Sequence, residues 1–293
     1  MSRAFVSGAF DDIRSRQIRF LEEASRLGSL TVCLWPDEAV ARVAGAAPKF
    51  GLAERRYFLE SMRFVDRVLV APEALDPDTL ELGAADPGVA GAAGAAGGLR
   101  GAAWVLPPEP APPGEGPSAA KLAFCARAGL EPRALRAAEL GGFPYEAPPY
   151  GAPIEGGRPR VIVTGCFDWF HSGHARFFEE AAAYGELNVV IGSDENLRLL
   201  KGEGHPLFPA EERRYVAASM RSAARVLVAS GSGWLDAEPE IVALGASRYV
   251  VNEDGDKPEK RRYCERQGIE YIVLKRSPKE GLPRRASTDL RGF

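Results

Sequence analysis

The chain carries one segment of sequence twice. Residues 4–11 match residues 161–168 at a constant offset. Further matches follow in the same order: ERRY at 54–57 and 212–215, RVLV at 67–70 and 225–228, and Cys-x-Arg-x-Gly at 125–129 and 264–268. A repeat of this length is too long for a solenoid and is typical of a duplicated domain. We therefore predict two homologous domains.

The length and composition agree with two domains. A chain of 293 residues is long enough for about two domains, and 45% hydrophobic residues can fill two cores. We place the domains at residues 1–143 and 158–293. The segment 144–159 is rich in Pro, Gly and Tyr, which favours an extended linker over a helix.

Short apolar runs alternate with longer amphipathic ones in both halves. Continuous apolar strands predict burial on both faces, and the alternation with helices predicts a parallel sheet. The expected strands lie near 4–6, 30–34, 68–70 and 103–106 in the first half, and near 161–164, 187–191, 225–229, 249–251 and 269–274 in the second. The predicted fold class is α/β, with two tandem Rossmann-like, doubly wound parallel-sheet domains.

Two stretches of the first half lack such patterning. Residues 83–101 are almost entirely Gly and Ala, and residues 106–117 are rich in proline. Neither composition supports a packed core, so we expect mobile or extended segments there.

Composition excludes several classes of protein. A net charge of −3 argues against a general nucleic-acid binder, although residues 257–291 carry an excess of basic side chains, which suit either a solvated surface or an anion site. We expect neither a secretory leader nor a membrane span. The four cysteines are widely separated, without metal-ligand spacing, and favour a reduced cytoplasm.

The scarce histidines mark a candidate site. Two of the three stand in His171-Ser172-Gly173-His174, directly after Gly165-Cys166-Phe167-Asp168-Trp169-Phe170. This is the first strand-to-helix turn of a doubly wound domain, where a helix that begins near Ser172 offers free N–H groups to phosphate. Gly173 lets a phosphate approach the main chain. A lone histidine is more often structural, but two that flank a glycine here favour phosphoryl chemistry.

Other kinds of site have weaker support. A metal site lacks a third nearby His or Cys, and His205 is the one remaining imidazole, on a segment that reads as a loop. The chain has neither a Walker-type P-loop nor a GxGxxG turn, which argues against a P-loop NTPase and a dinucleotide dehydrogenase.

At residues 160–291 the chain resembles the HxGH nucleotidyltransferases, and among them the cytidylyltransferase-like group. The pattern Gly-x-Phe-Asp-x-x-His-x-Gly-His stands complete at 165–174. Lys201 matches the lysine that follows strand two in that family, and the segment 284–288 (RRAST) resembles its C-terminal signature. The resemblance covers the second domain.

The resemblance implies a set of site residues. Catalysis would fall to His171, His174 and Lys201. Nucleotide binding would fall to Thr164, Gly165, Cys166, Phe167, Asp168, Gly173, Asn252, Asp254, Arg276, Arg285, Ser287 and Thr288. Mg²⁺ would accompany the nucleoside triphosphate, with Asp168 either holding it through water or stabilising the turn. Ser287 and Thr288 also read as an ordinary helix N-cap, and which C-terminal arginine binds phosphate stays open.

The tandem arrangement is similar to that of ethanolamine-phosphate cytidylyltransferases, but the first copy departs from the motif. Arg14 and Gln17 replace the histidines, Arg16 replaces the glycine, and Ala44 aligns with Lys201. We interpret the first domain as degenerate and non-catalytic. Residues 63–67 resemble a stretch that lies near the subunit contact of related dimeric enzymes, which suggests an internal pseudo-dimer in a monomeric chain.

The expected reaction transfers a nucleoside monophosphate, CMP from CTP, to a small phosphorylated acceptor and releases pyrophosphate. The acceptor implied by the resemblance is a phosphorylated alcohol or amino alcohol, with a sugar phosphate still open. Two alternatives remain: adenylyl transfer from ATP, and a nucleotide-sensing protein without turnover. Neither nucleic acid nor membrane is an expected partner.

Overall fold

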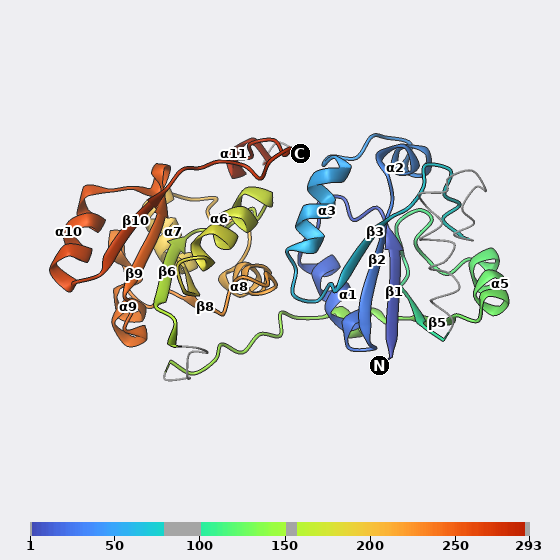
Figure 1. Cartoon of the computed structure of the whole chain (residues 1–293), viewed down its shortest axis with the longest axis horizontal. Coiled ribbons are helices and arrows are strands. Elements are labelled where there is room, and N and C mark those ends of the chain that lie inside the picture. Colours follow the sequence, from blue (N-terminus) through green and yellow to red (C-terminus); the bar gives the residue numbers. More distant parts are fainter. Residues whose placement is uncertain (1, 79–100, 151–156, 291–293) are drawn as a thin grey trace. The chain divides into compact units, whose positions relative to one another are not determined.

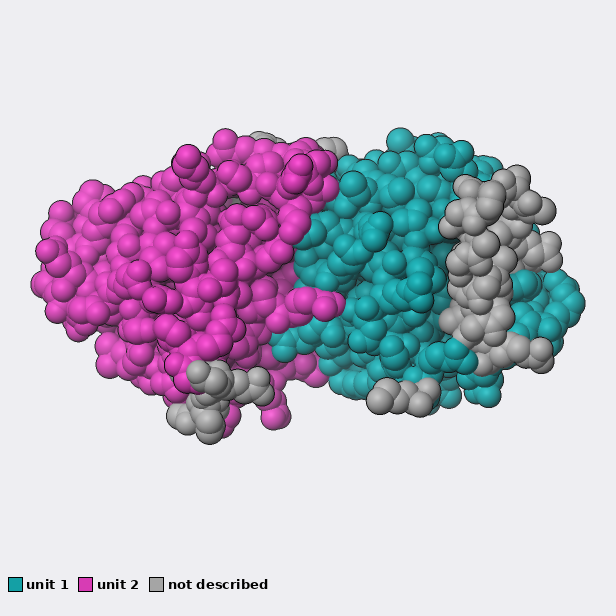
Figure 2. Space-filling model, viewed as in Figure 1, with its two compact units in different colours: residues 1–142 teal, residues 143–293 magenta. Residues whose placement is uncertain are grey.

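The computed structural model describes residues 2–78, 101–150 and 157–290 (Figure 1). The chain divides into two compact units, residues 1–142 and residues 143–293, which Figure 2 shows in separate colours. Within the described residues, no helix combines the length and the apolar character that a membrane span needs.

Unit 1 is built on a parallel sheet of five strands in the order β3-β2-β1-β4-β5. Its strands are β1 (Arg3–Gly8), β2 (Ser29–Leu34), β3 (Arg67–Val70), β4 (Ala103–Leu106) and β5 (Glu131–Ala134). Its helices are α1 (Ser15–Ser25), α2 (Asp37–Ala44), α3 (Leu52–Glu60) and α5 (Ala119–Ala128), with a 3₁₀ turn η1 (Ala137–Leu140).

Unit 2 repeats this order as β10-β9-β6-β7-β8, again with every strand parallel. Its strands are β6 (Arg160–Gly165), β7 (Glu186–Ile191), β8 (Arg225–Val228), β9 (Arg248–Asn252) and β10 (Glu270–Leu274). Its helices are α6 (Ser172–Ala182), α7 (Asp194–Lys201), α8 (Ala210–Ala218), α9 (Glu238–Leu244), α10 (Pro258–Gln267) and α11 (Ser287–Leu290), with 3₁₀ turns η3 (Gly233–Leu235) and η4 (Glu253–Gly255). The predicted tandem doubly wound fold is confirmed.

In both units a crevice opens where the strand order reverses. Strand β6 pairs with β7 along its whole length, whereas its pairing with β9 ends at Ile162 and Tyr249. The last residues of β6 therefore separate from those of β9. Across the start of this gap, the hydroxyls of Thr164 and Tyr249 lie 2.6 Å apart and share a hydrogen bond. A ligand can enter a doubly wound sheet at this point.

The repeated Cys-x-Arg-x-Gly segments end corresponding helices. Cys125 in α5 and Cys264 in α10 are fully buried in the apolar cores. Gly129 and Gly268 follow these helices with φ of 68° and 67°, a left-handed conformation that favours glycine at a helix C-terminus. All four cysteines are free thiols, as their spacing predicts.

Strand β5 has no counterpart among the strands predicted from sequence. Its residues Glu131–Ala134 are all exposed and include Pro132, so they form no apolar run. It lies at the edge of the sheet, the position where proline and polar side chains are tolerated.

The segment 143–150 packs on unit 2 rather than standing free between the domains. The buried Arg225 donates from Nε to Pro148 O (2.8 Å) and from Nη2 to Pro149 O (2.7 Å). The hydroxyl of Tyr145 accepts a hydrogen bond from the N–H of Val226 on the edge strand β8 (2.9 Å). The predicted linker 144–159 thus begins within unit 2, and residues 151–156 lie outside the described part of the chain, as do residues 83–100 of the Gly/Ala run.

Candidate functional site

A cavity of about 350 Å³ lies at the carboxyl ends of β6 and β9. Of the predicted site residues whose side chains are described, all but Arg285 line it: Thr164, Gly165, Cys166, Phe167, Asp168, His171, Gly173, His174, Lys201, Asn252, Asp254, Arg276 and Ser287. These residues come from the turn after β6, the ends of α6 and α7, the end of β9 and the segment before α11. The duplicated fold therefore brings the predicted residues to one place.

The turn after β6 has a tight main-chain geometry. Phe167 adopts a φ of +49°, which is unfavourable for a residue with a side chain. Its ring lies over Gly165, where a Cβ atom would come within 2.8 Å of it. Phe10, the corresponding residue of unit 1, has a φ of +46°. The turn geometry thus persists in both copies, including the copy without histidines.

The two histidines cap the first turn of α6. The N–H of Gly173 donates to Nδ1 of His171 (3.1 Å), and the N–H of His171 donates to Nδ1 of His174 (3.3 Å). Since each Nδ1 is an acceptor, each neutral ring carries its proton on Nε2. The rings stack with centroids 3.9 Å apart. A Cβ on Gly173 would lie 2.9 Å from the His171 ring, so glycine is also needed for this stacking.

His174 is held in the neutral form. Burial lowers its pKa well below 6.5, and the neighbouring His171 and the Arg276 guanidinium lower it further. A neutral imidazole with its proton on Nε2 is a hydrogen-bond donor that does not need to lose a proton first. Such a donor suits phosphate oxygens that gain negative charge during phosphoryl transfer.

The lowered pKa of His174 makes the stability of unit 2 depend on pH. Between that pKa and about 6.5 the unfolded chain binds more protons than the folded one. The free energy of unfolding should therefore fall as pH drops below 6.5, by up to about 1.4 kcal/mol per pH unit, and stay level above it. Urea unfolding at pH 7.5 and 5.5 measures this loss. A His174→Asn variant should lack this part of the pH dependence; the same dependence in both proteins would rule the explanation out.

Asp168 is occupied by main-chain donors. Its carboxylate accepts hydrogen bonds from the N–H groups of Leu207 (2.8 Å) and Phe208 (3.0 Å). In unit 1, Asp11 accepts from the N–H groups of Lys49 (2.6 Å) and Phe50 (2.9 Å) in the same way. Asp168 therefore has a turn-stabilising role, which the copy without histidines also keeps. Within the described ranges, no three His, Cys, Asp or Glu side chains gather as metal ligands.

Arg213, from the repeated ERRY segment, connects the turn after β6 with the end of β7, the start of α7 and the segment before α8. Its fully buried guanidinium donates to three main-chain oxygens and to Asp194: Phe208 O at 2.9 Å, Cys166 O at 2.8 Å, Gly192 O at 2.9 Å and Asp194 Oδ1 at 2.6 Å. Arg55 makes the corresponding contacts in unit 1, with Phe50 O, Ala9 O, Trp35 O and Asp37. The repetition of ERRY in the sequence does not reveal this role, because most contacts of the arginine lie far from it along the chain.

The C-terminal segment is tied to the cavity by Arg276. Its guanidinium donates to Asp254 (2.6 Å) and to the main-chain oxygen of Arg285 (3.0 Å). Ser287 Oγ donates to Trp169 O (3.1 Å), which connects α11 to the histidine turn. Arg285 lines a small adjoining cavity of about 20 Å³ together with Arg176, Lys275, Arg276 and Arg284. The side chain of Thr288 lies outside the described part.

Six further residues line the cavity: Phe177, His205, Val251, Gly255, Lys260 and Ala286. Lys260 was missed because it lies within α10, away from any motif. Burial lowers the pKa of its ammonium, while Asp236 raises it in part. Burial raises the pKa of the Cys166 thiol, and the nearby charge of Lys201 lowers it in part. Lys201 therefore lies close to the turn after β6. Cationic groups therefore reach the cavity from several elements.

Comparison with known proteins supports a common origin for this site. The family model described as "Cytidylyltransferase-like" matches residues 162–286. The FAD synthase of Methanopyrus kandleri is 31% identical over 132 residues, which cover 42% of this chain and 83% of that protein. The bifunctional protein HldE of Methylococcus capsulatus is 37% identical over 106 residues, 36% of this chain but only 21% of that protein.

A search of solved structures matches part of the chain to a lipopolysaccharide core biosynthesis protein from Thermoplasma volcanium. It is 22% identical, covers 42% of this chain and 100% of its own chain, and has a TM-score of 0.36.

Proposed function

Since the chain belongs to the cytidylyltransferase-like family of nucleotidyltransferases, we propose that unit 2 transfers a nucleoside monophosphate to a small phosphorylated acceptor and releases pyrophosphate. The observation that carries the proposal is the stacked pair His171 and His174 at the start of α6, beside a cavity of about 350 Å³. A phosphate oxygen of the acceptor attacks the α-phosphorus. The bond from that phosphorus to the bridging oxygen breaks, and both electrons leave with pyrophosphate.

The residues supply alignment and charge rather than a covalent intermediate. Both Nε2–H groups donate to phosphate oxygens, and the N–H groups at the start of α6 add to the positive end of that helix. Lys201 and Arg276 bring cations to the triphosphate, and Arg276 exchanges Asp254 for phosphate when the nucleotide binds. Mg²⁺, bound to the triphosphate, would offset part of its negative charge. Asp168 keeps its place in the turn.

CTP is the first donor to test, because the matching family model is described as "Cytidylyltransferase-like" and the motif resembles that group. ATP is the second, and one observation favours it: the named product of the similar FAD synthase contains an adenylyl group. The base would lie near Asn252, Gly255 and Lys260, which line the cavity at the end of β9 and in α10. A phosphorylated alcohol, amino alcohol or sugar would occupy the remaining part.

Unit 1 takes no part in the chemistry under this proposal. Arg14 and Gln17 stand at its histidine positions, and Ala44 ends α2 where Lys201 ends α7. The structural arginine and aspartate remain in unit 1, which fits a domain kept for its fold and not for nucleotidyl transfer. Pairing of the two copies as an internal dimer remains a proposal.

A turnover screen tests the function. CTP and ATP are incubated with Mg²⁺ and a panel of phosphomonoesters, and pyrophosphate release is followed together with the shift in melting temperature. We expect one donor and acceptor pair to give sustained release of pyrophosphate. A nucleotide that raises the melting temperature but gives no product with any acceptor would instead support the rival function, a nucleotide sensor without turnover.

A further inference from the structure

Unit 1 keeps a cavity in the place where unit 2 has its site. The cavity has a volume of about 320 Å³ and lies beside the turn after β1. Phe10 and Asp11 line it, just as the corresponding Phe167 and Asp168 line the cavity of unit 2. The duplication has therefore retained a concave site although the histidines are gone, and its remaining walls indicate what it binds.

A carboxylate occupies the main-chain turn after β1. This turn corresponds to the turn after β6, where we propose that unit 2 binds phosphate, and we call it the cradle. Oε1 of Glu115 accepts a hydrogen bond from the N–H of Ala9 (3.0 Å), the first N–H after β1. A Cβ on Gly8 would lie only 2.8 Å from the same oxygen. Glu115 thus stands where unit 2 offers its cradle to a ligand. It excludes phosphate by volume and by repulsion between like charges.

The loop that carries Glu115 is built to hold it there. Lys121 is buried, and its ammonium donates to the main-chain oxygen of Gly114 (2.7 Å), next to Glu115. Gly114 has a φ of +74° and packs so closely that a Cβ would lie 3.2 Å from the Trp35 ring. Ser118 caps α5 by accepting from the N–H of Lys121 (3.0 Å). The position of Glu115 is therefore fixed by the loop as a whole.

The other walls of the cavity are mainly apolar. Four prolines of the segment 107–112 line it, together with Phe10, Phe20 and Leu140. Aromatic rings and proline rings favour a ligand with an apolar or aromatic body.

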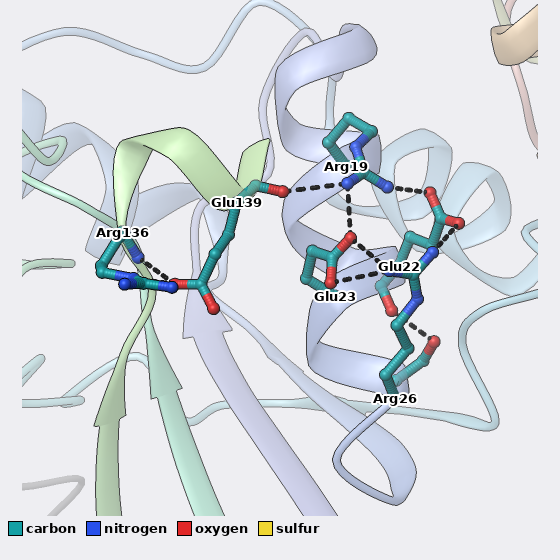
Figure 3. Close-up of polar contacts among 7 residues, drawn as sticks. Arg19, Glu22, Glu23, Arg26, Arg136 and Glu139 are labelled. Carbon is teal, nitrogen blue, oxygen red and sulfur yellow. Dashed lines mark hydrogen bonds and ion pairs between the residues drawn. The ribbon is translucent and has the colours of Figure 1, made fainter. Parts of the chain in front are cut away.

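The wall formed by Leu140 is held against α1 by a buried arginine. Arg19 donates from Nη2 to the main-chain oxygen of Glu139 (2.9 Å) and pairs with Glu22 and Glu23 on its own helix (Figure 3). Because Glu139 precedes Leu140 in η1, this contact fixes the apolar wall relative to α1. The cavity is thus enclosed by elements that the unit holds in place.

The charged groups around the cavity favour a cationic ligand. Asp11 is occupied by two main-chain N–H groups, and Arg16 is exposed, so solvent screens its charge. Burial raises the pKa of the Glu115 carboxyl to about 7, although the hydrogen bond from the N–H of Ala9 and the charge of Lys121 in α5 each lower it in part. A buried carboxyl is stabilised in its ionised form by a charged N–H donor. The cavity itself can receive that donor.

We propose that unit 1 holds a second ligand site, which binds a small organic amine with an apolar or aromatic body and rejects phosphates. The ammonium group pairs with Glu115, while the body of the ligand lies against the prolines, Phe10 and Phe20. This inference concerns unit 1 alone and does not depend on the reaction proposed for unit 2.

The test uses the full chain and three probes that share a benzene ring and differ in charge: benzylamine, benzyl alcohol and benzoate. We expect calorimetry near pH 7 to show benzylamine binding about tenfold more tightly than benzyl alcohol, since a charge-assisted contact is lost in the alcohol. Benzylamine should also release protons, because it lowers the pKa of Glu115; titrations in two buffers with different ionisation enthalpies detect this. Hydrogen exchange of the peptide over the β1–α1 turn should slow more with the amine than with the alcohol at equal concentration, and not with benzoate.

The variant Glu115→Gln keeps an acceptor for Ala9 N but removes the charge. It should bind benzylamine and benzyl alcohol equally, while Arg16→Gln should keep the preference for the amine. The proposal is overturned by equal binding of amine and alcohol to the natural chain, by binding of benzoate, or by slower exchange of the β1–α1 peptide with pyrophosphate. These three results do not require the Gln variant to fold.

Discussion

Replacing His174 with alanine should lower the rate of pyrophosphate release by about 10³-fold, the usual loss when one donor to a developing oxyanion is removed. His174 is neutral, and its Nδ1 is occupied by the N–H of His171. Only Nε2–H is left to face the phosphates. Steady-state turnover with the best donor and acceptor pair measures the loss, which should appear in kcat rather than in KM alone.

A second variant separates this role from the capping of α6. His174→Asn keeps an oxygen near the position of Nδ1 and can still accept from His171, but it has no group in the place of Nε2–H. Both variants should lose turnover equally, whereas only His174→Ala should lose the helix cap and about 1 kcal/mol of stability. An Asn variant with nearly natural turnover would contradict a role for Nε2–H. Substantial turnover in both variants would indicate that unit 1 catalyses after all.

The largest expected effect on stability belongs to Arg213→Met. This change leaves three main-chain oxygens and Asp194 without their buried donor. Loss of one partner from a buried charged network costs about 3 to 5 kcal/mol. We expect the free energy of unfolding of unit 2 to fall by that amount, which moves its unfolding transition to lower urea concentration. Turnover should also fall, because the turn at Cys166 loses its support.

The duplication supplies a matched control in Arg55→Met, which removes the same contacts from unit 1. It should destabilise unit 1 by a similar amount while unit 2 keeps its kcat. Arg56→Met serves as the neutral comparison, since Arg56 is exposed and forms a surface ion pair with Glu60. Surface pairs of this kind contribute less than about 1 kcal/mol. If Arg213→Met shifted the unfolding transition no further than Arg56→Met does, the buried contacts of Arg213 would not contribute to the stability of unit 2.

The sequence predicts those parts of the fold whose residues show a regular pattern over a short stretch of chain. The central strands are continuous apolar runs buried on both faces, so their composition alone identifies them. Strand β5 was missed because it has the opposite character, with four exposed residues and a proline at a sheet edge. The residues around Gly165 to His174 were found because the chemistry at one turn requires particular side chains at fixed spacing.

Other parts of the site depend on contacts that residue types do not encode. The acceptors of Arg213 are mostly main-chain oxygens, which any residue provides, so the sequence marked the arginine as repeated without showing why. Glu115 lies far from Ala9 in sequence and in a proline-rich stretch without a motif. Only the folded chain shows that this carboxylate occupies the cradle. The main-chain donors of Asp168, in Leu207 and Phe208, are likewise visible only in the folded chain.

The contact between Tyr145 and β8 has a consequence for how the molecule avoids self-association. An edge strand with free N–H groups offers itself to strands of other molecules and promotes aggregation. Here the tyrosine hydroxyl occupies the N–H of Val226, and the prolines that follow, which cannot donate to a sheet, accept hydrogen bonds from Arg225. The segment that joins the two units therefore also closes one open edge of the second sheet against intermolecular pairing.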